Sequence, residues 1–291
     1  MSHILKELDF VSGHNGFLGA KEDYNRAKIV IIGAPMDFTV SFRPGTRFGP
    51  ERIRSVSYGL ETYSVYADDA LDDKSFCDIG DIELPFGNVK KSLDMIEEAA
   101  NKILNDGKIP FFLGGEHLVT YPIVKKVAEK YPDLVVLHFD AHADLRDTFF
   151  GEKLSHATVL RRVSEQVKNK HIFQFGIRSG VKEEFLYAQQ HTNMYPLEVK
   201  TPFLQVLDSL KGKPVYITLD IDAVDPAFAP GTGTPEPGGC TSCDILEVVA
   251  SFGKLNVVGI DLVEVSPASD LSDRTALLAA KIVRETIIGI G

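Results

Sequence analysis

The chain has little of what marks secreted, membrane or nucleic-acid-binding proteins. Three cysteines in 291 residues, an odd number, favour reduced thiols in a cytoplasmic protein over a disulfide framework. No apolar run approaches the ~20 residues of a membrane span, and the best extends from Ile29 to Met36. Basic residues are outnumbered, because 31 lysines and arginines stand against 41 aspartates and glutamates, a net charge of −10. This balance disfavours nucleic-acid or anionic-membrane partners and is compatible with a small cationic substrate.

Further signals of other protein classes are missing. The N-terminal segment carries Lys6, Glu7 and Asp9 where a secretory peptide requires an apolar stretch, so we expect no export signal. The glycine-containing segments 33–35 and 231–235 lack the glycines of G-x-G-x-x-G and the lysine of a P-loop, so nucleotide binding is not supported. The chain shows no low-complexity linker, charge block or internal repeat. We therefore expect one domain over residues 1–291, with a core that needs no disulfide or metal to hold it.

What the chain does have is a regular alternation of short apolar runs and helical patterns. The apolar runs are mostly continuous, which is typical of strands buried on both faces of a parallel sheet. We predict strands over 28–33, 109–114, 134–139, 171–177, 214–220 and 256–261. We predict helices over 89–105, 119–130, 157–168, 182–190, 202–210, 242–252 and 271–288. This order favours βαβ units and an α/β sandwich, whose ligand sites gather at the carboxyl ends of strands.

The densest polar patterns lie where three predicted strands end. A D-x-H-x-D motif follows the strand that ends at Phe139, a D-x-D motif closes the strand that begins at Pro214, and a histidine follows the glycine pair after Leu113. Alternate side chains of an extended backbone share a face, so the acidic and imidazole groups of each motif point the same way. The six candidate ligands are His117, Asp140, His142, Asp144, Asp220 and Asp222.

The charge of these six residues predicts a metal centre. Four carboxylates that converge would repel one another unless some were protonated or a cation neutralised them. Four aspartates and two neutral histidines carry a charge of −4, which two divalent ions cancel, as in two-metal sites about 3.5–4 Å across. Oxygen-rich ligation favours Mn²⁺ over Zn²⁺, whose sites are usually tetrahedral and rich in cysteine or histidine.

Five segments, in order along nearly the whole chain, form a specific pattern: Ser41–Arg54, Gly114–His117 (GGEH), Phe139–Asp144 (FDAHAD), Leu219–Pro226 (LDIDAVDP) with the tail Ala229–Gly239, and Asp261–Pro267 (DLVEVSP). This pattern resembles the ureohydrolases, the family of arginases, agmatinases and their relatives. Leu118 after GGEH, and the segment Leu154-Ser-His-Ala-Thr158, look most like bacterial agmatinases.

The resemblance implies a fold, an assembly and a reaction. The fold would be the arginase-like three-layer α/β/α sandwich with a mostly parallel sheet, assembled as a homotrimer or homohexamer in the cytoplasm. The reaction would be hydrolysis of agmatine to urea and putrescine, a step of polyamine biosynthesis, by attack of metal-bridging hydroxide on the guanidinium carbon. The cofactors would be two Mn²⁺ ions per subunit, with Asp140 and Asp220 bridging. One ion would be held by His117, Asp140, Asp144 and Asp220, and the other by Asp140, His142, Asp220 and Asp222.

The same resemblance assigns roles to three catalytic residues. Glu264 takes the position of the carboxylate that orients the guanidinium, a planar cationic group that a carboxylate matches with paired hydrogen bonds. Asp144 is the expected proton donor to the leaving amine. His156 matches a histidine near the substrate that shuttles protons, in the titration range of an imidazole. The family's common Ser-His-Gly is Ser155-His156-Ala157 here, a small departure.

The substrate's tail is the point that the sequence leaves open. Arginases carry an asparagine two residues after the D-x-H-x-D motif, where this chain has Leu145-Arg146-Asp147. Asp147 would accept the ammonium of agmatine, whereas Arg146 would suit the carboxylate of 4-guanidinobutyrate. Overall likeness favours agmatine, with guanidinobutyrase the first alternative, ahead of formiminoglutamase and arginase.

Other interpretations fit the sequence less well. A metallophosphoesterase would place a G-N-H segment and further histidines downstream, and a non-catalytic relative would not keep every candidate ligand. Cys240 and Cys243 have C-x-x-C spacing, but a single such pair at an expected helix start gives little support for a redox role. His138 precedes Asp140 within the strand, where we expect a buried, hydrogen-bonded histidine rather than a ligand.

Overall fold

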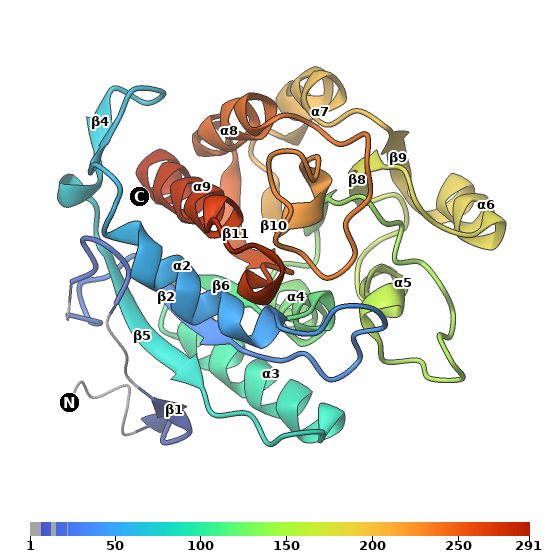
Figure 1. Cartoon of the computed structure of the whole chain (residues 1–291), viewed down its shortest axis with the longest axis horizontal. Helices are drawn as coiled ribbons and strands as arrows, with labels where there is room; N and C mark the ends of the chain where they lie inside the picture. Colours follow the sequence, from blue (N-terminus) through green and yellow to red (C-terminus); the bar gives the residue numbers. More distant parts are fainter. Residues whose placement is uncertain (1–6, 13–15, 22) are drawn as a thin grey trace.

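The computed structural model describes residues 7–12, 16–21 and 23–291, so Lys6 of the N-terminal segment lies outside the description. Over these residues, a nine-stranded sheet has the order β1-β5-β2-β6-β11-β10-β7-β8-β9 (Figure 1). Every neighbouring pair is parallel except β1 and β5. The strands of this sheet are β1 Val11–Ser12, β2 Ile29–Ala34, β5 Phe76–Ile82, β6 Ile109–Gly114, β7 Val135–Phe139, β8 Ile172–Ile177, β9 Asn193–Pro196, β10 Pro214–Asp220 and β11 Asn256–Val263.

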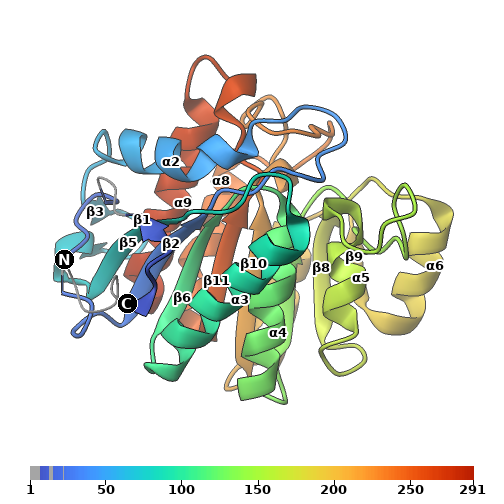
Figure 2. The same ribbon diagram turned by 90° about the horizontal axis from the view of Figure 1, so that it is seen from below.

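Helices cover both faces of this sheet and make it the middle of three layers (Figure 2). One layer contains α3 Val89–Asn105, α4 Thr120–Lys130, α5 Val159–Ser164 and α6 Lys182–His191. The other contains α2 Gly49–Ser57, α7 Lys200–Val206, α8 Ser242–Ala250 and α9 Arg274–Ile290. The predicted α/β sandwich with a mostly parallel sheet is therefore confirmed.

Strand β2 shows why continuous apolar runs predict this architecture. Ile29 and Ile31 pack in the core on the α2–α9 side, while Val30 and Ile32 pack in the core on the α3–α4 side. All four side chains are fully buried. Since successive side chains of a strand point to opposite faces, a strand between two helix layers must be apolar at every position.

The sequence analysis missed several elements, and their composition explains why. Strand β5 contains Asp78 and Asp81, whose charges hid the apolar pattern; Arg54, from α2, pairs with both. Helix α2 begins at Gly49-Pro50 and carries charged residues on much of its surface. The edge strand β9 is short and only partly buried, and a small hairpin of β3 Tyr63–Ser64 and β4 Asp69–Ala70 stands apart from the sheet.

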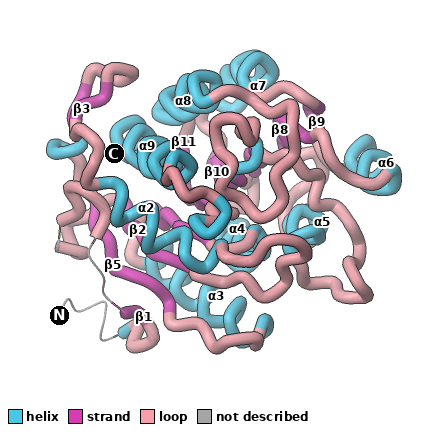
Figure 3. Tube along the Cα trace, in the orientation of Figure 1, coloured by secondary structure: helices cyan, strands magenta, loops and turns pink. Residues whose placement is uncertain are grey.

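The topology brings the carboxyl ends of four adjacent strands, β6, β11, β10 and β7, to one edge of the sheet. The loops that follow these strands gather over this edge, at the top of Figure 2 and toward the viewer in Figure 3. His117 follows β6, Glu264 follows β11, Asp220 ends β10 and Asp140 follows β7. Segments far apart in the sequence thus place the predicted site residues close together.

No helix among the described residues is both long and apolar enough to cross a membrane.

Candidate metal centre and substrate pocket

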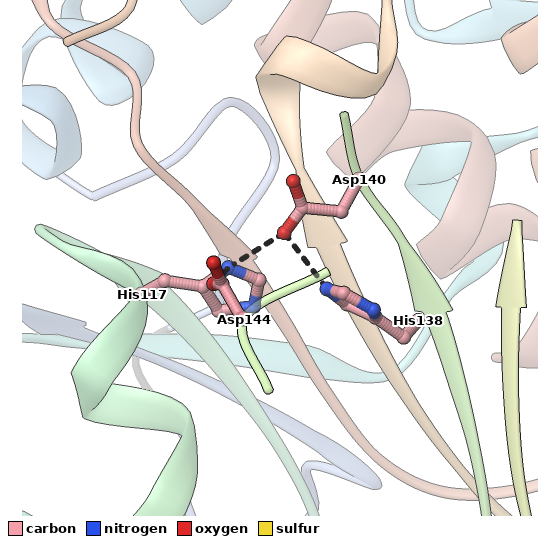
Figure 4. A group of neighbouring side chains, drawn as sticks. All are labelled: His117, His138, Asp140 and Asp144. Carbon is pink, nitrogen blue, oxygen red and sulfur yellow. Dashed lines mark hydrogen bonds and ion pairs between the residues drawn. The ribbon is translucent and has the colours of Figure 1, made fainter. Parts of the chain in front are cut away.

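Three aspartates converge on one ring nitrogen of His117. The Nδ1 atom lies 3.0 Å from a carboxylate oxygen of Asp140, 3.3 Å from one of Asp220 and 3.4 Å from one of Asp144. Figure 4 shows Asp140 between the rings of His117 and His138. All of these side chains are buried. The structure therefore brings together the four residues predicted to hold one ion.

A second group adjoins the first and shares Asp140. The Nδ1 atom of His142 lies 2.9 Å from a carboxylate oxygen of Asp222 and 3.5 Å from Oδ1 of Asp140. The other oxygen of Asp222 accepts a hydrogen bond from the backbone N–H of Ala141 at 3.0 Å, and Asp220 accepts one from the N–H of Asp222 at 2.8 Å. Asp140, His142 and Asp222 have the spacing of a metal-binding group, as do His117, His138, Asp140 and Asp144.

The hydrogen bonds of His117 indicate which face of its ring is free to bind a metal. Its Nε2 lies 2.9 Å from the hydroxyl of Thr218, which donates to Asp261 at 2.6 Å and therefore accepts from His117. This assigns the proton to Nε2 and leaves a lone pair on Nδ1. Among the described residues Nδ1 has no hydrogen-bond partner although it is buried. A buried lone pair that faces three carboxylates fits a bound cation, because only a cation satisfies all four groups at once.

The pKa values of the clustered aspartates also favour a bound cation. Burial, and then the charge of Asp140, raise the pKa of Asp144 to about 7. Burial and the charges of Asp222 and Asp140 raise the pKa of Asp220 well above its ordinary value. Over the described residues, no lysine or arginine forms an ion pair with the four aspartates. The imidazoles of His117, His138 and His142 are thus the only basic groups that pair with these aspartates in the described part of the chain.

A pocket of about 220 Å³ opens onto this cluster. Its inner wall includes His117, His142, Asp144, Asp220 and Glu264. The remaining lining residues come from loops and from α6: Ser41, Ala143, Arg146, Phe149, His156, Ala157, Ser179, Gly180, Glu184 and Thr234. A small molecule that enters the pocket therefore contacts the cluster with one end and the loop residues with the other.

Glu264 lies in the pocket as predicted. Its Oε1 accepts the backbone N–H of His117 at 2.8 Å, which ties the end of β11 to the turn after β6. Burial raises the pKa of Glu264 to about 8, and the charge of the neighbouring Glu116 contributes. The backbone of Glu264 and that of Asp144 have positive φ angles of 65° and 53°, a conformation that costs of order 1–3 kcal/mol for a non-glycine residue. Such strain is common at functional sites.

His156 also lines the pocket, held by hydroxyl groups of a distant loop. Its backbone N–H donates to Thr39 Oγ1 at 3.0 Å, and its Nε2 lies 3.2 Å from the hydroxyl of Ser41. The ring packs edge-on against Phe149. Burial lowers the pKa of His156 to about 4, so the ring is neutral near pH 7. A neutral ring suits contact with a substrate better than the proton shuttling expected from the sequence.

Of the two residues predicted to bind the substrate's tail, one lines the pocket and the other does not. Arg146 lines the pocket, with its guanidinium 5.3 Å from the ring centre of Phe149 and its Nε 3.6 Å from Glu184. Asp147 is absent from the described pocket wall; its side chain is 62% exposed and pairs with Arg162 at 2.9 Å. Asp147 therefore does not occupy the place expected of it, because the backbone after Arg146 turns it toward solvent.

Sequence reasoning missed two buried carboxylates of this region. Glu116 accepts the backbone N–H groups of Phe38 and Thr39 at 3.1 and 2.9 Å and so anchors the loop that contacts His156. Glu184 accepts the N–H groups of Leu145 and Val181, both at 2.8 Å, and lines the pocket. Glu116 stands inside the GGEH motif and could have been examined on that ground. Glu184 stands three residues after the N-cap Val181 of α6, a local capping position, whereas its contact with Leu145 is distant in sequence and gives no signal.

The C-x-x-C pair shows little sign of redox chemistry. Cys240 and Cys243 are both free thiols, the first half-buried and the second exposed. Burial raises the pKa of Cys240 to about 12, which keeps that sulfur protonated and unreactive.

Comparison with known proteins supports the interpretation of the site. Residues 27–289 match the Arginase family. The chain is 52% identical to an agmatinase of Bacillus anthracis over 276 residues, which cover 94% of this chain and 95% of that protein. It is 36% identical to a guanidinobutyrase of Pseudomonas aeruginosa over 273 residues, 88% of this chain and 84% of that protein.

A solved structure agrees with this result. The agmatine ureohydrolase of Thermoplasma volcanium superposes with a TM-score of 0.87 at 33% identity, over 98% of this chain and 97% of that one. The match covers all three layers and the segments that carry the predicted ligands. The chain therefore belongs to the arginase family and is a metal-dependent ureohydrolase that most resembles bacterial agmatinases.

Proposed function

We propose that the protein hydrolyses agmatine to urea and putrescine at a centre of two Mn²⁺ ions. The observation that carries this proposal is the mostly buried group of four aspartates and two histidines that pairs with no lysine or arginine among the described residues and faces a pocket containing Glu264. The identity of about one half to a bacterial agmatinase supports agmatine as the substrate.

The residues on the cluster fit two oxygen-preferring divalent ions. We assign His117, Asp140, Asp144 and Asp220 to one ion, and Asp140, His142, Asp220 and Asp222 to the other. Carboxylate oxygens dominate both sets, which favours Mn²⁺ over softer metals. When bound, such ions lower the pKa of water and make a nucleophile available at neutral pH.

Three further roles, in binding the guanidinium, transferring a proton and contacting the substrate, fall to residues of the pocket. Glu264 holds the guanidinium by charge-assisted hydrogen bonds and fixes its plane toward the cluster. Asp144, whose pKa burial raises to about 7, accepts a proton and passes it to the leaving amine. His156, neutral and held by Thr39 and Ser41, contacts the substrate from the opposite wall.

The tail of agmatine is an ammonium, and the pocket offers one carboxylate beyond Glu264 and the proposed ligands. This is Glu184, whose oxygens are presented by two backbone hydrogen bonds. We therefore propose Glu184 in place of Asp147 as the tail's acceptor. Arg146 favours the second candidate function, guanidinobutyrase, since its guanidinium lines the same wall and suits a carboxylate.

Urea release tests these alternatives directly. Mn²⁺-reconstituted protein is assayed with agmatine and with 4-guanidinobutyrate, and EDTA-treated protein serves as the blank. We expect metal-dependent urea from agmatine at least tenfold faster. Preference for guanidinobutyrate would keep the centre and transfer specificity to Arg146. No urea from either substrate would refute both assignments.

Three broader expectations rest on the family resemblance. We propose that residues 1–291 form a single domain, that the protein acts in the cytoplasm, and that it assembles as a homotrimer or homohexamer. Light scattering on the purified protein would measure the assembly.

A further inference from the structure

His138 is a buried histidine that neither the family resemblance nor the proposed mechanism uses. Its Nε2 lies 2.7 Å from Oδ2 of Asp140, and its ring centre lies 5.2 Å from that of His117 (Figure 4). By distance alone it belongs to the possible metal-binding group of His117, Asp140 and Asp144. Distance alone therefore leaves two roles open, a metal ligand or a residue that positions one.

The neighbouring glutamine distinguishes these roles. The side-chain nitrogen of Gln174 lies 3.1 Å from Nδ1 of His138 and donates to the carbonyl of Ala143 at 3.0 Å. Its side-chain oxygen accepts the hydroxyl of Thr192 at 2.8 Å. Both partners fix the amide in this orientation, since the flipped amide would place its oxygen against the carbonyl of Ala143.

The amide orientation fixes the proton on His138. An amide nitrogen only donates, so Nδ1 of His138 must accept. The ring then carries its single proton on Nε2 and donates it to Asp140. A nitrogen that carries a proton has no lone pair for a metal.

We propose that His138 is a positioning residue for Asp140 and not a metal ligand, and that the chain of hydrogen bonds from Thr192 through Gln174 holds it in that role. This inference rests on the metal centre proposed above. Asp140 is the carboxylate shared by both ligand groups, so its orientation affects both. His138 anchors Oδ2, while the backbone N–H of His142 anchors Oδ1 at 2.5 Å. With both oxygens held, the carboxylate is fixed between His117 and His142.

The test combines NMR with metal titration on the full-length protein. In ¹⁵N-labelled protein treated with EDTA, we expect the shifts of His138 to show a proton on Nε2. In Gln174→Met, which keeps the length of the side chain but removes the donor, we expect this signature to disappear. Mn²⁺ affinity, measured by calorimetry, should fall about 10- to 100-fold, the usual effect of losing an outer partner of a metal ligand.

Thr192 provides a milder pair of variants if Gln174→Met does not fold. Thr192→Ser keeps the hydroxyl and should retain the wild-type affinity, while Thr192→Val should weaken Mn²⁺ binding. His138→Asn should still bind two Mn²⁺ ions, more weakly. Loss of one whole equivalent in His138→Asn, a proton on Nδ1 in the wild type, or unchanged affinity in folded Gln174→Met would each overturn the inference. If the wild-type protein bound no Mn²⁺, the metal centre itself would fail, while the NMR result would still decide the proton's position.

Discussion

Two clusters of charged residues, one beside strand β5 and one at the carboxyl ends of the central strands, differ in the basic groups that they contain. In the first, the guanidinium of Arg54 is 2% exposed and bonds Asp78 at 2.7 and 2.9 Å, with Asp81 on its other side. In the second, Asp140, Asp144, Asp220 and Asp222 converge with only imidazoles as neighbours. The first cluster contains a guanidinium, whereas the second contains imidazoles as its only basic groups among the described residues.

This difference separates a structural group from a functional one. Burial and the charges of neighbouring carboxylates raise the pKa of Asp144 and Asp220, although the nearby imidazoles oppose this rise. Beside Asp78 and Asp81, the guanidinium of Arg54 donates four hydrogen bonds, one of them to the carbonyl of Gly80. Buried carboxylates that lack a cation are costly unless an ion from solution supplies one, so they mark the site.

The largest effect is expected when a carboxylate is removed from the second cluster, which contains Asp140, Asp144, Asp220 and Asp222. Asp220→Ala should abolish Mn²⁺ uptake and urea release together, to the level of the EDTA blank. Asp220→Asn, which keeps an acceptor for the N–H of Asp222, should do the same. Both are measured by calorimetry and urea assay. Because Asp220→Asn keeps this acceptor, it should not lower the unfolding temperature of the EDTA-treated protein, whereas Asp220→Ala removes it and should lower that temperature. Residual activity would refute the bridging role.

Removal of Arg54 from the first cluster should have the opposite result, with a loss of stability but no change in metal binding or turnover. Arg54→Met removes the guanidinium that pairs with the buried carboxylates of Asp78 and Asp81, and we expect a loss of about 3–5 kcal/mol of unfolding free energy in urea. The folded fraction should keep wild-type Mn²⁺ affinity and turnover. The double variant Asp78→Asn/Arg54→Met should recover part of the loss. Weaker Mn²⁺ binding in folded Arg54→Met would show that the two clusters are coupled.

The raised pKa values in the pocket region predict how the stability of the metal-free protein depends on pH. The pKa values of Asp144 and Glu116 are raised to about 7 and that of Glu264 to about 8. At pH 6.5 these groups hold protons in the folded chain but not in the unfolded one, and they release these protons as the pH rises to 8.5. The EDTA-treated protein should therefore lose stability as pH rises, on the order of 2 kcal/mol.

Mn²⁺ should reverse this trend, because it binds the deprotonated groups. Urea unfolding at pH 6.5, 7.5 and 8.5, with Mn²⁺ and with EDTA, measures the effect. His156, whose pKa is lowered to about 4, contributes with the opposite sign only below pH 6.5. Equal stability of the EDTA-treated protein at all three pH values would contradict the assigned shifts.

The smallest effect is expected at an exposed ion pair. Asp147→Asn breaks the contact with Arg162 on the surface and should change kcat/KM for agmatine less than about twofold and stability by less than about 1 kcal/mol. Glu184→Gln serves as the contrast and should raise KM for agmatine. A large effect of Asp147→Asn on KM would restore the tail-reading role that the sequence suggested.

Local patterns account for most of what could be predicted. Six strands were found because their apolar runs are continuous, and His117, Asp140 and Asp220 were found because each follows or ends one of them. Strand β5 was missed because the partner of its acidic residues, Arg54, lies 24 residues before Asp78.

The site features that the sequence did not predict depend on tertiary contacts. Glu184 lies in the pocket wall and accepts the N–H of Leu145, a contact across 39 residues that no spacing rule reveals. Asp147 follows a predicted pocket residue by one position, yet faces Arg162 and solvent. Adjacent loop residues diverge because no regular backbone period fixes their direction, as it does in a strand.

Asp144 and Glu264 share one more property, a left-handed backbone at φ angles of 53° and 65°. Glycine at either position would relieve this backbone strain, but it would remove a carboxylate and, at Glu264, the acceptor of the His117 N–H. A variant made more stable by glycine at either position would therefore lose a carboxylate that lines the pocket, so thermal stabilisation and catalysis place opposite demands on these two residues.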